Sequence, residues 1–309
     1  MSLTVKFSAT ESILIKNPAT ISEQLDKLKE RGLLIDDEKK AYATLETINY
    51  YRLVHYFAVF LEESGEYYRE GTRFSDAIRL YEFDRKLRME LLVALEEIEI
   101  ALRTAVSNYH AVTYGAIGYL KDHTFDSRRH NHKVFLHKIE RITSKNSDLP
   151  FVKHHNERYA GKMPLWVMME MFSFGMLVFF FQDLKKEDKK LIAQHYFDLD
   201  FRMVESWLDN LADLRNHCAH YNRVYGNPLP EQLRSIEITH PREYEMGSSL
   251  FDYLIVIKLL HKRSDIKISD KTWGKKFTGI LTALFEEYSD IVDSKVLGFP
   301  NDWEEFIYE

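Results

Sequence analysis

Apolar residues recur at helical spacing along most of the chain. The clearest run extends from Phe74 to about Tyr114 and predicts a long core helix. Its apolar positions lie three or four residues apart and include Phe83, Leu87, Leu91, Ala94, Leu95, Ile98, Leu102, Ala105 and Tyr109. Glu99 and Arg103 lie one turn apart on this helix, in the order that favours an ion pair. We therefore expect Glu99 either to be buried against Arg103 or to belong to a charged helix face.

Shorter helices are predicted on both sides of the long one. Ile21, Leu25 and Leu28 share one face of a short amphipathic helix, and residues 37–63 predict one or two more. A helix follows the charged turn at residues 185–188, and the next helix carries a conspicuous polar motif. The last apolar elements are helices over residues 248–261 and 276–291, separated by a charged turn at 261–272.

Residues 163–181 form an apolar run that reaches the length of a membrane-spanning helix. Its single charged residue, Glu170, lies near the middle, where a carboxylate costs a few kcal/mol on insertion scales. The sequence therefore predicts a buried core helix over about residues 164–182 and no membrane association.

The composition agrees with an all-α fold. Only 12 Gly and 7 Pro are present among 309 residues, too few for the many tight turns of a sandwich or barrel. Neither an internal repeat nor a Gly/Ser linker is visible, so we expect one helical domain over residues 1–309, with a basic inserted lobe at about 118–162. The single cysteine, Cys218, excludes an internal disulfide, and no signal peptide is recognisable, which favours the cytoplasm.

The charge distribution permits nucleic-acid binding only locally. The formal net charge is −6, whereas proteins that bind nucleic acid are more often basic overall. Residues 128–162 are the exception, with nine basic and three acidic residues. This stretch predicts either an RNA-binding surface or simply a solvated helix face.

Residues 215–220, Arg-Asn-His-Cys-Ala-His, are the best candidate for chemistry. RNA cleavage without a metal needs a base for the 2′-hydroxyl proton, a cation for the charge on phosphorus and an acid for the departing 5′-oxygen. Histidine can serve as base or acid near neutral pH, and arginine binds two phosphate oxygens without losing its charge.

The spacing within this motif raises a geometric difficulty. Arg215 and His220 are five residues apart, about 140° around an ideal helix, and so do not share a face. Asn216 and His220, four apart, do share one. Either the helix is distorted or ends at His220, or two copies of the motif meet across a two-fold axis. The apolar stripe of this helix, Trp207, Leu211, Leu214 and Cys218, is expected to face the core, and the helix to end near residues 221–227.

Other reactive side chains suggest no second site. The histidines between residues 130 and 155 match no zinc spacing and have no cysteines beside them, so we predict neither a metal nor another cofactor. Cys218 belongs to the apolar stripe and is expected to be a buried structural thiol. No phosphate-binding glycine loop is present.

Several segments together resemble the AbiD/AbiF-type abortive-infection family. Residues 214–223 look like the R-N-x-x-x-H signature of the HEPN ribonucleases in the form that this family carries. The remaining landmarks follow in order along the chain: N-Y-Y-R-L at 49–53, the F-D-x-x-L-R and I-E-x-x-L-R segments of the long helix at 83–88 and 98–103, P-x-W, Glu170 and S-F-G between 164 and 175, and L-G-F-P at 297–300 with Trp303.

This resemblance implies a HEPN-like helical bundle and a toxin-like endoribonuclease that acts in phage defence without a metal. It also implies a homodimer with the two motifs facing each other, and control by an RNA or protein antitoxin. By position, Arg215, Asn216 and His220 would be the catalytic residues. Residues expected to contact RNA around them and in the basic lobe are His217, Arg223, Arg128, Arg129 and Lys133. The alternative is a non-cleaving module that uses the same motif, either to bind RNA or as the part of a regulatory complex that an antitoxin sequesters.

Overall fold

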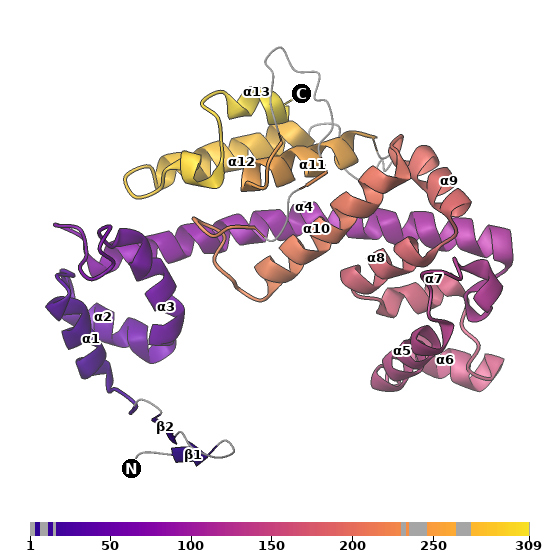
Figure 1. Ribbon diagram of the computed structural model, residues 1–309, viewed down its shortest axis with the longest axis horizontal. Coiled ribbons are helices and arrows are strands. Elements are labelled where there is room, and N and C mark those ends of the chain that lie inside the picture. The colour runs from indigo at the N-terminus through magenta and orange to yellow at the C-terminus, as the bar shows by residue number, and fades with distance from the viewer. Residues whose placement is uncertain are drawn as a thin grey trace. The chain divides into compact units, whose positions relative to one another are not determined.

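The computed structural model describes residues 4–6, 12–14, 17–229, 233–234, 246–263 and 273–308. By contacts the chain divides into two compact units, which we call unit 1 (residues 1–85 and 288–292) and unit 2 (residues 86–287 and 293–309). Helices make up nearly all of the described structure (Figure 1), which confirms the all-α prediction. A two-stranded antiparallel pairing of β1 (Thr4–Lys6) with β2 (Ser12–Leu14) precedes them. The single domain expected over residues 1–309 stays a prediction.

Unit 1 begins with three short helices, as the apolar pattern predicts. Thr20 and Glu23 form a capping box that starts the first of them, in which the threonine oxygen accepts from the Glu23 amide and the carboxylate accepts from the Thr20 amide. Inside the unit, the Tyr56 hydroxyl donates to the buried carboxylate of Asp84 at 2.8 Å. The helices are α1 (Ile21–Glu30), α2 (Glu38–Thr47) and α3 (Tyr50–Phe57), followed by the short turn η1 (Ala58–Phe60).

The long helix α4 spans Phe74–Tyr114, the range predicted from the sequence. Its residues up to 85 belong to unit 1 and those from 86 onward to unit 2. The apolar positions at Phe83, Leu87, Leu91, Leu95 and Leu102 are all fully buried. A helix of this length thus supplies core residues to both units.

The basic lobe is a separate group of short elements within unit 2. Two single-turn helices, η2 (Gly118–Leu120) and η3 (Asp122–Thr124), lead into α5 (His132–Lys145) and α6 (Pro150–Tyr159). Phe135 and Ile139 supply the buried face of α5. Its other positions are largely exposed and include four basic residues of the lobe, Lys133, Lys138, Arg141 and Lys145.

The apolar run after the lobe is not one helix, so this part of the sequence prediction is wrong. It forms α7 (Leu165–Met168), the turn η4 (Met169–Met171) and, after an extended Phe172, α8 (Phe174–Asp183), which Ser173 caps. The carbonyls at the break are used by Arg103 of α4, whose guanidinium donates to Met169 O at 3.0 Å and to Phe172 O at 3.1 Å. Among the described helices, none combines the length and the apolar character needed to cross a membrane.

The motif helix and the last helices of the chain complete unit 2. That helix, α10 (Phe201–Ala219), packs on α8 and α9 (Lys186–Phe197), and α11 (Leu250–Arg263) contacts α9 and α13 (Trp303–Tyr308). The predicted stripe of α10 is confirmed, because Trp207, Leu211, Leu214 and Cys218 are all at most 1% exposed. The chain closes with α12 (Trp273–Glu287) and η5 (Ser294–Leu297) before α13. Of the charged turn predicted over residues 261–272, residues 264–272 lie outside the described residues.

Candidate functional site

The motif lies at the carboxyl end of α10, where the helix stops abruptly. Ala219 is the last helical residue and His220 is the C-cap. Tyr221 follows with a φ of 62°, and two amides then close the end: Tyr221 N–H donates to Cys218 O, and Asn222 N–H donates to His217 O, each at 3.1 Å. This pair of bonds is a Schellman motif. The helix therefore ends before the predicted residues 221–227, and the alternative that it ends at His220 is confirmed.

Arg215 is held by a carboxylate from the long helix. Its Nε lies 3.8 Å from Oε2 of Glu99, and the other oxygen of Glu99 accepts a 2.8 Å hydrogen bond from Arg103. The Glu99 side chain is 14% exposed and that of Arg215 is 35% exposed. Because the pair is long and Arg215 is partly open to solvent, the guanidinium keeps N–H groups for an anion.

The Glu99–Arg103 pair was expected from their spacing, whereas the contact of Glu99 with Arg215 was not. The two residues lie on α4 and α10, which are far apart in the sequence, and no local pattern connects them. Arg103 is itself fixed by the two carbonyls at the break between η4 and α8. A chain of polar contacts thus runs from the backbone of that break through Arg103 and Glu99 to Arg215.

The other motif residues differ in how many hydrogen bonds their side chains make. Asn216 accepts a long 3.4 Å hydrogen bond from Arg215 Nη1. The ring of His217 is half-buried, and its Nε2 lies 2.8 Å from the carbonyl oxygen of Arg223, so this imidazole helps to fix the turn. His220 is exposed, and its side chain makes no hydrogen bond or ion pair within the described part of the chain. Its ring is accessible to a ligand, and the catalytic roles of all three residues stay predictions.

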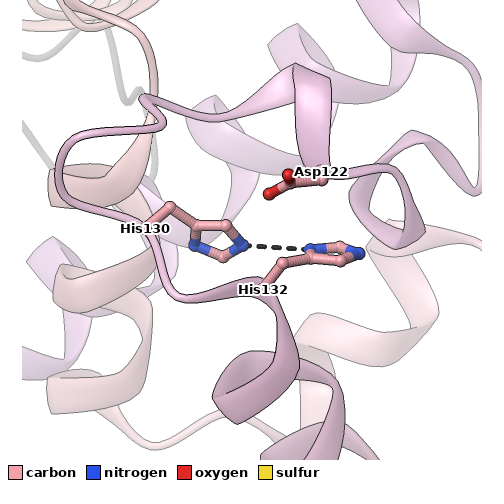
Figure 2. A group of neighbouring side chains, drawn as sticks. All are labelled: Asp122, His130 and His132. Atoms are coloured by element: carbon pink, nitrogen blue, oxygen red, sulfur yellow. Dashed lines mark hydrogen bonds between the residues drawn. The ribbon is translucent and has the colours of Figure 1, made fainter.

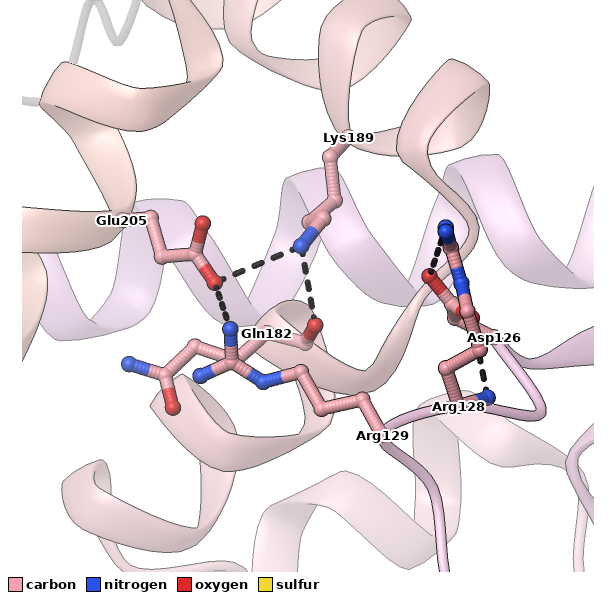
Figure 3. Close-up of polar contacts among 6 residues, drawn as sticks. All are labelled: Asp126, Arg128, Arg129, Gln182, Lys189 and Glu205. Atoms are coloured by element: carbon pink, nitrogen blue, oxygen red, sulfur yellow. Dashed lines mark hydrogen bonds and ion pairs between the residues drawn. The ribbon is translucent and has the colours of Figure 1, made fainter.

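Two of the basic residues expected to bind RNA are paired with acids (Figure 3). Arg128 contacts Asp126 at 3.3 Å, and its hydrogen bonds lower the pKa of the Asp126 carboxyl. Arg129 donates to Glu205 at 2.8 Å. The same Glu205 oxygen lies 3.3 Å from the ammonium group of Lys189, a buried side chain that also donates to Gln182 O at 3.0 Å. Arg129 and the buried Lys189 thus share one carboxylate.

Other cations of the lobe remain at the surface. Lys133 is exposed. A pocket opens between α5 and α8, and the Lys138 ammonium group lies over the Phe179 ring there, 5.6 Å from its centroid. Basic, polar and apolar side chains line this pocket together, among them His137, Lys138, Arg141, Lys145, Met176 and Phe179. An anion with an apolar portion fits such a lining.

Metal-ligating side chains meet elsewhere in the lobe. Asp122, His130 and His132 each place one ligand atom within 4.8 Å of the others. The sequence analysis did not predict this group, because the spacing of its histidines matches no zinc motif and Asp122 lies eight residues before the first of them. The one available signal was a carboxylate and two imidazoles within a short stretch of the chain.

Comparison with known proteins assigns the family. The family model described as Abi-like protein matches residues 43–226, more than half of the chain. The matched range includes the whole of α4 and ends just after the Schellman motif that follows His220. No curated protein and no solved structure matches the chain.

The chain therefore belongs to the family of Abi-like proteins. This confirms the abortive-infection family named from the sequence landmarks. Membership in this family indicates a role in abortive infection, a form of phage defence.

Proposed function

We propose that this Abi-like protein is an endoribonuclease of the HEPN type that cleaves RNA without a metal, with Arg215, Asn216 and His220 at its active site. The observation that carries the proposal is the contrast between the two ends of the motif. Arg215 lies within ion-pair distance of Glu99 and is partly open to solvent, and His220 is exposed at the end of the same helix. A cation beside the phosphate and an accessible imidazole are two of the groups that the reaction requires.

In the proposed reaction an imidazole removes the proton from a ribose 2′-hydroxyl, and the 2′-oxygen attacks the adjacent phosphorus. The bond from phosphorus to the 5′-oxygen then breaks, and an acid supplies the proton that this oxygen takes up. Arg215 stabilises the additional negative charge on the phosphate oxygens. The products are a 2′,3′-cyclic phosphate and a free 5′-hydroxyl.

One copy of the motif supplies one accessible imidazole, whereas the reaction uses a base and an acid. His217 is a weak candidate for the second, because one of its ring nitrogens already contacts the Arg223 carbonyl. We infer that the second group is His220 of another copy, brought close by a two-fold axis. RNA is the substrate, with Lys133, Arg128 and Arg223 as contacts outside the reacting groups, and an RNA or protein antitoxin is the expected means of control.

A second candidate function is RNA binding without cleavage. It is favoured by the pocket between α5 and α8, in which Lys138, Arg141 and Lys145 lie beside the Phe179 ring. Such a surface binds phosphate and a stacked base without needing a proton-transfer group. The two functions differ in what they require of His220.

The deciding experiment is incubation of the purified protein with total bacterial RNA in excess EDTA, followed by chemical mapping of new ends. We expect cuts with 2′,3′-cyclic phosphate ends from the wild type and none from Arg215→Ala or His220→Ala. His195→Ala is the matched control, because His195 is an exposed histidine of α9 outside the motif. Equal cutting by His220→Ala and wild type would overturn the nuclease. RNA bound but uncut by the wild type, with affinity reduced in Arg215→Ala or Lys138→Ala and unchanged in His220→Ala, would support the binding module instead.

A further inference from the structure

Asp122, His130 and His132 gather where the loop after α4 enters α5 (Figure 2). Asp122 opens the single turn η3, His130 lies in the loop and His132 is the first residue of α5. The His130 side chain is buried, His132 is half-buried and Asp122 is exposed. The group is therefore closed on one side and open to solvent on the other.

The outer nitrogens of both imidazoles face oxygen atoms that can only accept. Nδ1 of His130 lies 2.9 Å from the Asp183 carboxylate, and Nε2 of His132 lies 3.1 Å from the carbonyl oxygen of Leu120. Since a carboxylate and a carbonyl have no proton to give, these two nitrogens carry the ring protons. The tautomers of both histidines are thereby assigned from their partners.

The consequence appears at the inner nitrogens. Nε2 of His130 and Nδ1 of His132 lie 3.1 Å apart, and in neutral rings with these tautomers both present a lone pair. Two acceptors at this distance repel each other unless a positive charge lies between them. The carboxylate of Asp122, the third member of the group, adds negative charge to the same space.

We propose that Asp122, His130 and His132 bind one divalent transition-metal ion, with zinc as the best fit. Zinc–nitrogen bonds of about 2.0–2.1 Å at a tetrahedral ion place two nitrogens about 3.3 Å apart, close to the spacing of the inner pair. Asp122 is exposed and can turn its carboxylate onto the ion, which leaves a fourth position for water. Two imidazoles with one carboxylate suit zinc better than magnesium or calcium, which prefer oxygen ligands alone.

The surroundings are those of a built site. A carboxylate or carbonyl behind each ligating imidazole fixes its orientation, as Asp183 and the Leu120 carbonyl do here. Phe125 stacks on the His130 ring with centroids 4.0 Å apart and an angle of 17° between the planes. Of the neighbouring arginines, Arg128 is paired with Asp126, and Arg129 shares Glu205 with the buried Lys189.

This ion would tie η3 to the start of α5 and so stabilise the basic lobe. It is separate from the proposed cleavage chemistry, in which none of these three residues takes part. RNA cleavage by a protein that binds no zinc would therefore contradict only the metal site. Zinc binding by a protein that does not cleave RNA would contradict only the nuclease.

The test is titration of EDTA-treated, dialysed full-length protein with ZnCl₂ by calorimetry, with metal content measured on the protein as purified. We expect one zinc ion per chain, a higher melting temperature with zinc, and a visible absorption spectrum typical of tetrahedral Co²⁺ when cobalt is substituted. Asp122→Asn is expected to weaken zinc binding at least tenfold and His132→Ala to abolish it. His137→Ala, which changes an exposed histidine of α5 outside the group, is the control and should bind like the wild type.

Circular dichroism in EDTA shows whether each variant is folded. The substitutions are made at the exposed Asp122 and the half-buried His132, so the test does not require a change at the buried His130. Lack of stoichiometric zinc binding by the folded wild type would overturn the proposal. So would equal binding by wild type and His132→Ala, or nitrogen NMR spectra that show only a proton shared by the two rings in the presence of zinc.

Discussion

The Nε atom of Arg215 lies 3.8 Å from the carboxylate of Glu99, which Arg103 holds from the other side with a 2.8 Å hydrogen bond. Two guanidinium groups thus share one carboxylate that is largely removed from solvent. The charges are not equally exposed, since the Arg103 side chain is 16% exposed and that of Arg215 is 35% exposed. Arg103 therefore has a mainly structural role, and Arg215 is the one that can meet a ligand.

Replacing Glu99 should impair cleavage without unfolding the protein. In Glu99→Gln, Arg103 keeps its two carbonyl partners, but Arg215 loses the charge that positions it. We expect the single-turnover rate of RNA cleavage to fall about tenfold, or about 1.4 kcal/mol in activation free energy. Glu96→Gln is the control, since Glu96 is exposed on the same helix. An unchanged rate in Glu99→Gln would show that Arg215 does not depend on this carboxylate.

His110 should make the protein sensitive to acid. It is fully buried on α4, and neither ring nitrogen has a hydrogen-bond partner among the described residues. Burial lowers its pKa to about 4 against the opposing effect of Asp188, so the unfolded chain takes up the proton first as the pH falls. The uncharged His110 ring makes its full contribution to stability above about pH 6.5, and this contribution is lost as the pH falls from 6.5 to 4. At about 1.4 kcal/mol per pKa unit, the loss is about 3 kcal/mol.

His110→Phe is the variant that checks this effect, because phenylalanine fills a similar volume and does not titrate. Urea denaturation at several pH values should show a shallower loss of stability below pH 6.5 in the variant than in the wild type. If the free energy of unfolding fell equally with pH in the two proteins, His110 would not be the source of the acid sensitivity.

Glu205 should be essential for the stability of unit 2. Its carboxylate is the acidic partner of the buried Lys189 ammonium group, which is 7% exposed, and also of Arg129. Removing one partner of a buried pair typically costs about 3–5 kcal/mol. We expect a loss of about 3 kcal/mol for Glu205→Gln in urea denaturation and partial recovery when Lys189→Met is added. Glu187→Gln, at an exposed position of α9, should change stability by about 0.5 kcal/mol or less.

Cys218 should be unnecessary for cleavage. The thiol is 1% exposed on the apolar stripe of α10. A buried thiol of this kind is inert as a nucleophile. Cys218→Ala is expected to keep wild-type cleavage and to lose about 1 kcal/mol of stability, and the wild-type thiol should react with Ellman's reagent only after denaturant is added. Fast reaction in the native protein, or loss of cleavage in the variant, would point to a chemical role.

The long helix shows what could be predicted from the sequence. Between Phe74 and Tyr114 the chain has neither glycine nor proline, and its apolar residues keep the helical period without a break. Local information therefore determines both its existence and its ends. The stripe of α10 was predictable for the same reason.

The prediction of a single helix over the apolar run after the lobe was wrong because the apolar residues there show no helical period. When nearly every residue is apolar, each turn of helix looks like the next, and a break leaves no mark. The interruption at Phe172 is instead matched by Arg103, a residue of α4 that uses the freed carbonyls. Contacts between distant segments also explain why the role of Glu99 at the motif and the meeting of Asp122 with the two histidines were not foreseen.

The turn at Tyr221 determines how the motif would respond to insertions and deletions. The Schellman bonds close the helix directly behind His220, so a residue added after Asn227 leaves Arg215 and His220 in register. A residue added between Asn216 and His220 would turn the imidazole by about 100° relative to the guanidinium. If the proposed mechanism is right, such an insertion would keep every reacting group present and still abolish cleavage. The number of residues between the two is therefore as much a part of this site as their identities.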